Sequence, residues 1–155
     1  FVPVLLLFLG CFVSCAGSTG GGIKLVRMLV LVRLAQRELV RIIHPRVVYP
    51  VTLGRGGALA PDVIWAIMAF MLIYGGVMTA LTLVMLATGL DVVTAFSSVV
   101  ACLNNIGPGM GKVGPAGNYA ALNNFQLSLC SLAMLLGRLE LLSVLVLLTP
   151  QFWRR

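Results

Sequence analysis

The sequence predicts an all-α membrane protein built from helix–loop–helix units, and three observations indicate this class. Hydrophobic residues make up 60% of the 155 residues and charged residues only 10%, whereas a soluble domain carries about 25% charged residues. The mean hydropathy of the chain is +1.07. The apolar residues also gather in long runs, which clusters of glycine, proline and basic residues separate.

The net charge of +7 could suggest a nucleic-acid partner, but its distribution indicates membrane topology instead. Two arginines end the chain, and most other basic residues lie between the first two apolar runs: Lys24, Arg27, Arg33, Arg37, Arg41, Arg46 and Arg55. Cytoplasmic loops carry such an excess of Lys and Arg. We therefore place the linker 44–61 and the C-terminus in the cytoplasm, with no nucleic acid and with anionic membrane lipid as a secondary partner.

The first expected unit, residues 1–43, is a membrane helix that is broken by a glycine-rich stretch. Four of the six residues from Gly17 to Gly22 are glycines, and each costs a helix about 1 kcal/mol relative to Ala. We expect the helix to break there and to resume at Ile23. A plain kink or a close-packing surface is the alternative. A phosphate-binding loop fits poorly, because in that motif the Lys directly follows a Gly, whereas here Ile23 separates Gly22 from Lys24.

The second expected unit is the cytoplasmic linker 44–61. His44 precedes a proline, which disfavours the helical conformation, so a helix should end there and His44 should be structural. Three prolines and three glycines follow within the linker. The chain begins with Phe1, without Met or a charged leader, and we expect upstream sequence to be missing.

The third expected unit, residues 62–155, reads as span, short helix, loop and span. Asp62 suits the positive end of the first span, 62–88. The short helix 91–102, which Asp91 can cap, is too short to cross a bilayer, since crossing needs about 20 apolar residues. The chain should therefore enter the membrane, turn back through the loop 103–122, and leave by the span 123–149.

The loop that follows the short helix carries the candidate ion site. Its order follows the x-Val/Ile-Gly-x-Gly rhythm of potassium filters, and the candidates are Asn104, Asn105, Ile106, Gly107, Pro108 and Gly109. Irregular backbone at membrane depth is tolerated where it lines a water-filled cavity, and backbone carbonyls can replace the water around an ion. We expect the main-chain carbonyls of residues 104–107 to hold K⁺. The alternative is a plain turn at the outer surface.

An interruption is also expected halfway along the last span, at Gly137–Glu140. Arg138 is costly in mid-membrane and should face the bundle interior or water. An ion pair that only holds the bundle together is the alternative, although residues two apart on a helix, such as Arg138 and Glu140, do not face each other.

No cofactor and no enzyme site are expected. Cys11 and Cys15 lie one helical turn apart, but no His or carboxylate nearby completes a metal site, so small buried side chains are the better reading. An intramembrane hydrolase using Ser14 or Ser18 would need a base within reach, and His44 is expected outside the membrane.

Five runs carry a resemblance to a known family: Cys15–Lys24, His44-Pro45 with Tyr49-Pro50, Leu103–Gly109, Leu135–Glu140 and Thr149–Trp153. Together they resemble the membrane subunit of bacterial Trk-type potassium uptake systems, within the Trk/Ktr/HKT superfamily, over the whole chain and in the family's order. The resemblance implies four helix–pore loop–helix repeats of potassium-channel type around one pore. This chain would hold the last part of the third repeat and the complete fourth, without the first two repeats.

The resemblance also implies roles for single residues. Gly107 would be the filter glycine of its repeat. A gate would lie below the filter, formed by an intramembrane loop with the pore arginine Arg138 and its neighbour Glu140; the loop residues are Gly17, Ser18, Thr19, Gly20, Gly21 and Gly22. The implied partners are a second copy, as a homodimer, and a TrkA-type cytoplasmic subunit that binds nucleotide. A symporter coupled to H⁺ or Na⁺ and a non-conducting structural subunit remain alternatives.

Overall fold

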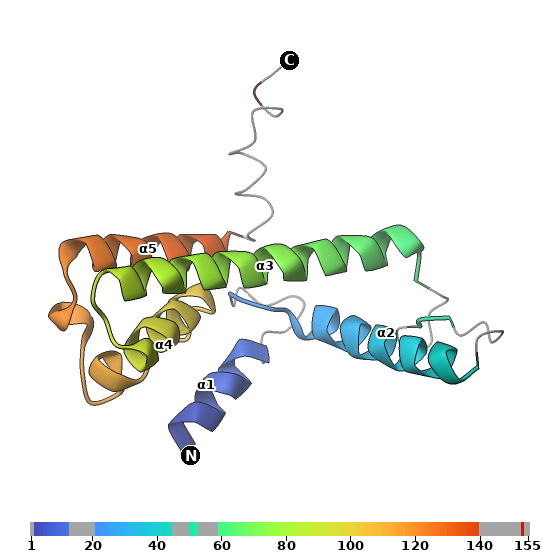
Figure 1. Ribbon diagram of the computed structural model, residues 1–155, viewed down its shortest axis with the longest axis horizontal. Helices are drawn as coiled ribbons and strands as arrows, with labels where there is room; N and C mark the ends of the chain where they lie inside the picture. The colour runs from blue at the N-terminus through green and yellow to red at the C-terminus, as the bar shows by residue number, and fades with distance from the viewer. Residues whose placement is uncertain (1, 13–20, 45–49, 53–58, 140–152, 154–155) are drawn as a thin grey trace.

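The computed structural model describes residues 2–12, 21–44, 50–52, 59–139 and 153, and this part of the chain is helical (Figure 1). Its helices are α1 (Val2–Phe12), α2 (Leu25–Ile43), α3 (Pro61–Ala87), α4 (Val92–Leu103) and α5 (Asn124–Arg138), with the 3-10 turns η1 (Gly111–Val113) and η2 (Tyr119–Ala121). The described residues contain no β-strand, so the all-α prediction is confirmed.

The long helix α3 is the element along which the others are arranged. In Figure 1, α2 lies beside its N-terminal half and α5 beside its C-terminal half, while α4 lies beneath it. Among the described helices, α3 is the one that is long and apolar enough to cross a membrane, with 27 residues and a hydropathy of 2.1. It begins with Pro61 and Asp62, as the sequence predicts, because proline and an acidic residue both suit the first turn of a helix.

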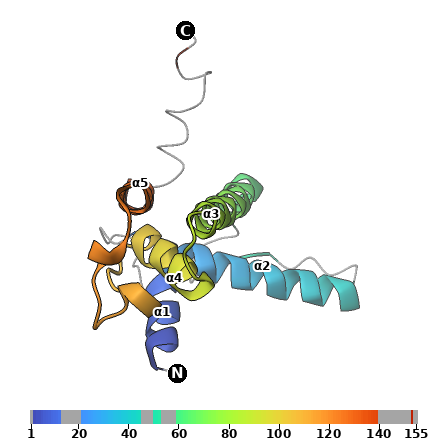
Figure 2. The same cartoon turned by 60° about the vertical axis from the view of Figure 1, so that its left-hand side comes forward.

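The short helix α4 is the centre of the fold. It packs against α3, α5 and η1 and also contacts α1 (Figure 2). From Thr94 to Leu103 every residue except Phe96 is buried. The Asp91 carboxylate caps the helix as predicted, since it accepts hydrogen bonds from the Thr94 N–H at 3.0 Å and the Thr94 hydroxyl at 2.9 Å.

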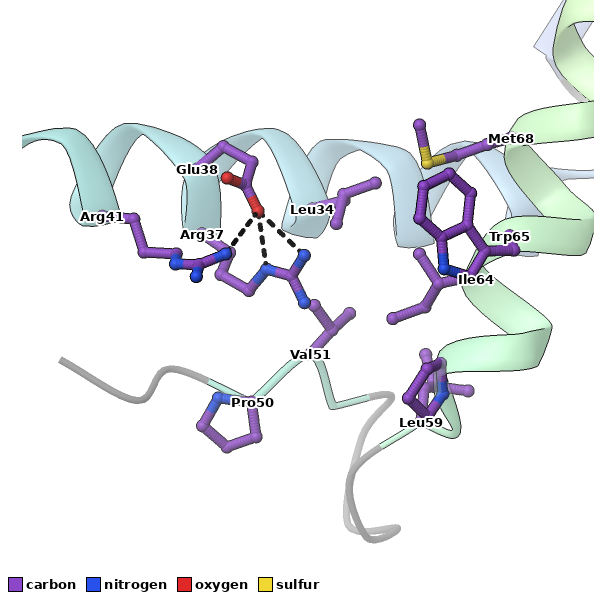
Figure 3. Close-up of a pocket in the computed structure, with 11 residues that line it drawn as sticks. Leu34, Arg37, Glu38, Arg41, Pro50, Val51, Leu59, Ile64, Trp65 and Met68 are labelled. Atoms are coloured by element: carbon purple, nitrogen blue, oxygen red, sulfur yellow. Dashed lines mark hydrogen bonds and ion pairs between the residues drawn. The ribbon is translucent and has the colours of Figure 1, made fainter. Parts of the chain in front are cut away.

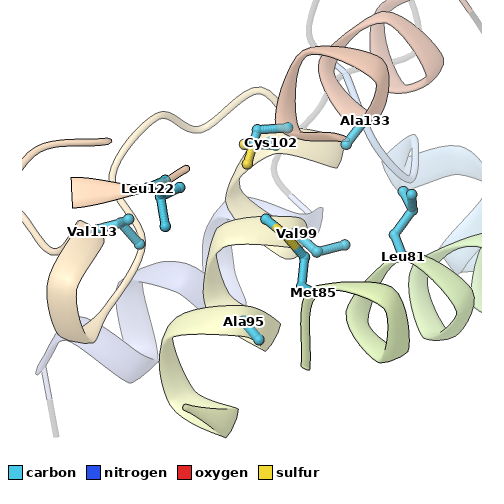
Figure 4. Packing of buried hydrophobic residues seen from close by; sticks show 9 residues of the cluster. Leu81, Met85, Ala95, Val99, Cys102, Val113, Leu122 and Ala133 are labelled. Atoms are coloured by element: carbon cyan, nitrogen blue, oxygen red, sulfur yellow. The ribbon is translucent and has the colours of Figure 1, made fainter. Parts of the chain in front are cut away.

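A hydrophobic cluster holds α4 between its neighbours (Figure 4). Its members come from α3, α4, α5 and the loop between the last two: Leu81, Met85, Ala95, Val99, Cys102, Val113, Leu122, Cys130 and Ala133. A hydrogen bond also joins the first turn of α5 to the C-cap of α3, from Gln126 Nε2 to Thr88 Oγ1 at 2.8 Å. These contacts fix the helix whose end carries the candidate site.

Some expected boundaries move by one or two residues. The helix after the glycine-rich stretch begins at Leu25 instead of Ile23, because Lys24 has an extended conformation and Ile23 is buried against α3 and the end of α4. The last span is described as far as α5 and Leu139. Residues 140–152 lie outside the described residues, as do 13–20.

Candidate functional site

The candidate site begins where α4 ends, and a Schellman motif makes that end. Asn105 has a positive φ of 55°. Its N–H donates to the Cys102 carbonyl at 3.1 Å, and the Ile106 N–H donates to the Ala101 carbonyl at 2.9 Å. This pair of bonds is the usual helix end around a left-handed residue. It turns the backbone sharply at Asn105, and the negative end of the helix dipole lies beside the residues that follow.

The side chain of Asn104 is part of the scaffold. It is 6% exposed, and its Oδ1 accepts a hydrogen bond from the Tyr74 hydroxyl in α3 at 2.9 Å. Its Nδ2 donates to the Val100 carbonyl at 2.9 Å and to Cys11 Sγ in α1 at 3.5 Å. Three helices therefore meet at this amide, and the main chain is what Asn104 can offer to an ion.

Gly107 has a backbone conformation that a side chain would strain. Its φ is +104°, and a Cβ added there would meet no atom within 4 Å, so the constraint is conformational instead of steric. Its carbonyl accepts a hydrogen bond from the Tyr119 hydroxyl at 2.8 Å. A carbonyl oxygen has a second lone pair, which this bond does not use. Asn105, Gly107 and Pro108 are exposed in this chain.

The chain after Gly107 returns to α4 and is fastened there. The Gly109 N–H donates to the Val113 carbonyl at 2.9 Å, and the Met110 N–H donates to Ser97 Oγ at 2.8 Å. A Cβ added at Gly109 would lie 2.8 Å from the Val113 side chain and 3.2 Å from Ser97 Oγ. The buried Ser97 hydroxyl of α4 and the Val113 carbonyl of η1 thus hold the far end of the segment 104–109.

Two of the expected gate residues lie directly against the expected filter residues. A Cβ added at Gly22, whose φ is +83°, would overlap Asn104 Oδ1, and one added at Gly21 would overlap Asn105 Nδ2. The sequence alone did not predict these contacts. The remaining expected loop residues Gly17, Ser18, Thr19 and Gly20, and also Glu140, lie outside the described residues.

Arg138 ends α5 close to the same place. The preceding residue, Gly137, approaches the Leu103 carbonyl so closely that a Cβ would overlap its oxygen. Asn105 Nδ2 also donates to the Met134 carbonyl of α5, at 3.4 Å. The backbone at Arg138 is therefore held near the end of α4.

The described residues contain no group of three or more His, Cys, Asp or Glu side chains that could hold a metal ion. Cys11, Cys102 and Cys130 are free thiols, and Cys15 lies outside the described residues.

A separate hollow of about 410 Å³ lies between α2, the linker and the start of α3 (Figure 3). Its walls are mainly apolar and include Leu34, Ile64 and Trp65. At its rim, Arg37 Nη2 binds Glu38 Oε1 at 2.8 Å, and Arg41 Nη1 lies 3.7 Å from the same oxygen. The hollow is in the region that the sequence places at the cytoplasmic face.

The sequence did not predict the roles of Tyr74 and Tyr119. Tyr74 lies within a uniformly apolar span and Tyr119 within a loop of small residues. A buried tyrosine hydroxyl usually finds a hydrogen-bond partner, so a tyrosine in an apolar span, such as Tyr74, signals a partner without identifying it. The half-buried Tyr119 carries a weaker signal of the same kind.

Comparisons with known proteins show the family of this chain. The family model described as "TrkH: Cation transport protein" matches residues 1–155. The chain is 46% identical over 154 residues to the Trk system potassium uptake protein TrkH of Vibrio parahaemolyticus, covering 99% of this chain and 31% of that protein. It is 36% identical over 151 residues to TrkG of Escherichia coli K12, covering 97% of this chain and 30% of that protein.

The crystal structure of the potassium transporter TrkH from Vibrio parahaemolyticus superposes with a TM-score of 0.88 at 45% sequence identity. The match covers 99% of this chain and 32% of that one. The chain thus spans about a third of the length of the relatives that it matches. With the family model matching its whole length, this chain belongs to the TrkH family of cation transport proteins.

Proposed function

We propose that this chain is the C-terminal part of a potassium uptake subunit of the bacterial inner membrane. The curated relatives that it matches are named as Trk system potassium uptake proteins. K⁺ would pass down its electrochemical gradient, and an inside-negative potential contributes about 2.3 kcal/mol per charge per 100 mV. The function is transport, and no bond of a substrate is made or broken.

One observation carries the proposal: the buried helix α4 ends in an irregular and partly exposed backbone segment. Asn105 and Gly107 both have positive φ, so successive carbonyls do not follow one helical or extended direction. The segment is fastened to α3 through Asn104, to η1 through Gly109 and to α4 through Met110. A frame that holds main-chain oxygens in place suits a carbonyl filter, and the Gly107 oxygen keeps a second lone pair beside its bond from Tyr119.

In the proposed filter, K⁺ is held by the main-chain carbonyls of Asn104, Asn105, Ile106 and Gly107. Pro108 and Gly109 complete the turn that returns the chain to α4. One such segment would form one of four walls, and the other three would come from the part of the full-length relatives that this chain does not span.

The proposed gate lies beneath the filter and consists of the loop Gly17–Gly22 with Arg138. The contacts of Gly21 and Gly22 with the two asparagines support this placement. The Arg138 charge would raise the barrier to cations and bond to carbonyls of the loop, and Glu140 would anchor neighbouring backbone.

The proposed assembly is a homodimer that meets a TrkA-type nucleotide-binding subunit on the cytoplasmic face. The linker 44–61 and the C-terminus would lie on that face. The basic rim of the hollow beside Trp65, with Arg37 and Arg41, supports contact with anionic membrane lipid there, because arginine binds phosphate and aromatic side chains favour the interface.

The test is potassium uptake by the full-length protein in cells that lack their own uptake systems. Gly107→Ser should weaken the preference for K⁺ over Na⁺, because a side chain at φ +104° forces the backbone to rearrange. Gly76→Ser, at a helical position where a Cβ meets nothing within 4 Å, is the matched control. If Gly107→Ser inserts normally and transports like wild type, a non-conducting structural subunit is the better description.

The same cells separate uniport from symport. Uptake that persists with the proton and sodium gradients collapsed and the voltage clamped supports a channel-like path. Uptake that stops under those conditions supports a symporter of the same fold.

A further inference from the structure

Two tyrosine hydroxyls from separate elements donate to the predicted filter segment, one at each end. The Tyr74 hydroxyl of α3 donates to Asn104 Oδ1 at 2.9 Å, and the Tyr119 hydroxyl of η2 donates to the Gly107 carbonyl at 2.8 Å. We propose that Tyr74 and Tyr119 are positioning residues that set the ion selectivity of this segment. The proposal rests on the filter function proposed above, and it assigns selectivity to two side chains that do not touch the ion.

Tyr74 is itself held firmly. It is 6% exposed and packs in a cluster with Ile23, Phe70, Leu103 and Leu136. Its ring is stacked on that of Phe70, with the centroids 6.0 Å apart. The hydroxyl is therefore presented from a fixed place on α3, outside the chain segment that it binds.

The bond from Tyr74 completes the fixation of Asn104. The amide Nδ2 already donates to the Val100 carbonyl within α4 at 2.9 Å, so the amide plane is tied at both ends. Asn104 is the C-cap that directly follows the last residue of α4, and its carbonyl is the first of the proposed ligands. Without the Tyr74 hydroxyl, the buried Asn104 Oδ1 would lose its hydrogen-bond donor. An unpaired buried acceptor is costly, which favours rotation of the Asn104 amide.

Tyr119 acts on the other end of the segment. No heavy atom lies within 4 Å of the Cβ position of Gly107, so packing does not restrain that side of the glycine. The Tyr119 hydroxyl fixes the direction of its carbonyl, and Cys102 Sγ of α4 lies 3.8 Å from the same hydroxyl. Through the Tyr119 hydroxyl, the direction of the Gly107 carbonyl therefore depends on the buried residue Cys102 of α4.

These bonds bear on selectivity because a carbonyl filter distinguishes ions by where its oxygens are held and how strongly they attract the ion. Removing either hydroxyl lets one end of the segment adopt other arrangements, some of which suit the smaller Na⁺. We expect each loss to lower the K⁺ to Na⁺ ratio about two- to tenfold, the factor that corresponds to one typical hydrogen bond. A purely structural role would instead lower the yield and thermal stability and leave the ratio unchanged.

The experiment compares K⁺ and Na⁺ flux per molecule for the purified full-length protein in lipid vesicles, with Tyr74→Phe, Tyr119→Phe and Thr79→Val. Each change removes one hydroxyl and keeps the shape of the side chain. Thr79 is the matched control, because it is an exposed residue of α3 whose hydroxyl donates only to the Gly75 carbonyl of its own helix, at 2.8 Å. Gly107→Ser is measured in parallel as the test of the filter itself.

We expect both Tyr→Phe variants to lower the K⁺ to Na⁺ ratio while Thr79→Val retains it. If Gly107→Ser lowers the ratio and the two Tyr→Phe variants match wild type, the filter stands and the positioning role of the tyrosines is overturned. If only one Tyr→Phe variant lowers the ratio, the role of the other is overturned. A ratio that Gly107→Ser also leaves unchanged overturns the filter, and the tyrosine proposal with it.

Discussion

Gly137 of α5 lies against the main-chain carbonyl of Leu103, the last residue of α4, so closely that a Cβ on residue 137 would overlap the carbonyl oxygen and lie 2.8 Å from its carbon. The neighbour is backbone at the end of a buried helix, so it cannot turn aside as a flexible side chain could. The glycine therefore sets the distance between the two helices beside the proposed filter.

Gly137→Ala should force α5 away from the end of α4. We expect a loss of about 1–3 kcal/mol in the free energy of unfolding, the usual cost of overfilling a packed site. The measurement is thermal unfolding of the full-length protein in detergent. Gly76→Ala is the control, since a Cβ there meets nothing within 4 Å and alanine favours a helix by about 1 kcal/mol over glycine. Equal melting temperatures for the two variants would contradict the close approach.

Gly22→Ala should disturb the site more than Gly10→Ala does. At Gly22 a Cβ would overlap the hydrogen-bonded amide of Asn104, and the φ of +83° adds backbone strain. At Gly10 the nearest atom is the end of the flexible Ile106 side chain, at 2.7 Å, which can rotate away. Potassium uptake per molecule should fall for Gly22→Ala and stay near wild type for Gly10→Ala. A larger loss of uptake in Gly10→Ala than in Gly22→Ala would mean that the contact between Gly22 and Asn104 is not needed for transport.

The helical framework could be predicted from the sequence because its signals are local. Pro61 and Asp62 begin α3, and Asp91 caps α4 through a residue three positions away. The position of the irregular segment after α4 was also predictable, because the glycine rhythm after a short apolar helix is a pattern within a few residues; its role as a filter stays a prediction.

The hydrogen bonds and close contacts that hold the site in place were not predictable, because they join residues far apart in the chain. Tyr74 and Asn104 are separated by 30 positions, and nothing in a uniformly apolar span marks one face of the helix as the one that meets α4. The glycines at 21 and 22 predicted a helix break, but the asparagine amides that they contact depend on how α1, α2 and α4 are packed. Periodicity and composition carry no information on that packing.

The cap of α4 should make stability depend on pH in a definite direction. Hydrogen bonds from the Thr94 hydroxyl and N–H hold the pKa of the Asp91 carboxyl below its usual value of 3.8. A carboxyl whose pKa is lowered by folding stabilises the protein above the unfolded pKa and loses that contribution as the pH falls through the folded pKa. Thermal unfolding of wild type and Asp91→Ser should therefore differ most above about pH 5 and converge at lower pH.

Asp91→Ser is the informative variant because serine also caps helices but does not titrate. The melting temperature of Asp91→Ala should be lower than that of Asp91→Ser at every pH. A wild-type advantage over Asp91→Ser that stays constant down to about pH 2 would show that the charged form of the carboxylate is not what stabilises α4.

Arg138 gives the prediction that tests the proposed conducting path below the proposed filter. A positive charge in the path of a cation raises the barrier to its passage, because charges in a low-dielectric surrounding interact strongly. Arg138→Ala should therefore raise K⁺ flux per molecule severalfold, and Arg138→Lys should stay close to wild type because it keeps the charge. The measurement is K⁺ flux into lipid vesicles at equal amounts of inserted protein. Arg33→Ala, which removes a positive charge from an exposed position of α2, should leave the flux unchanged. A flux that falls equally in Arg138→Ala and Arg138→Lys would assign the guanidinium to holding the helices together instead of to the ion path.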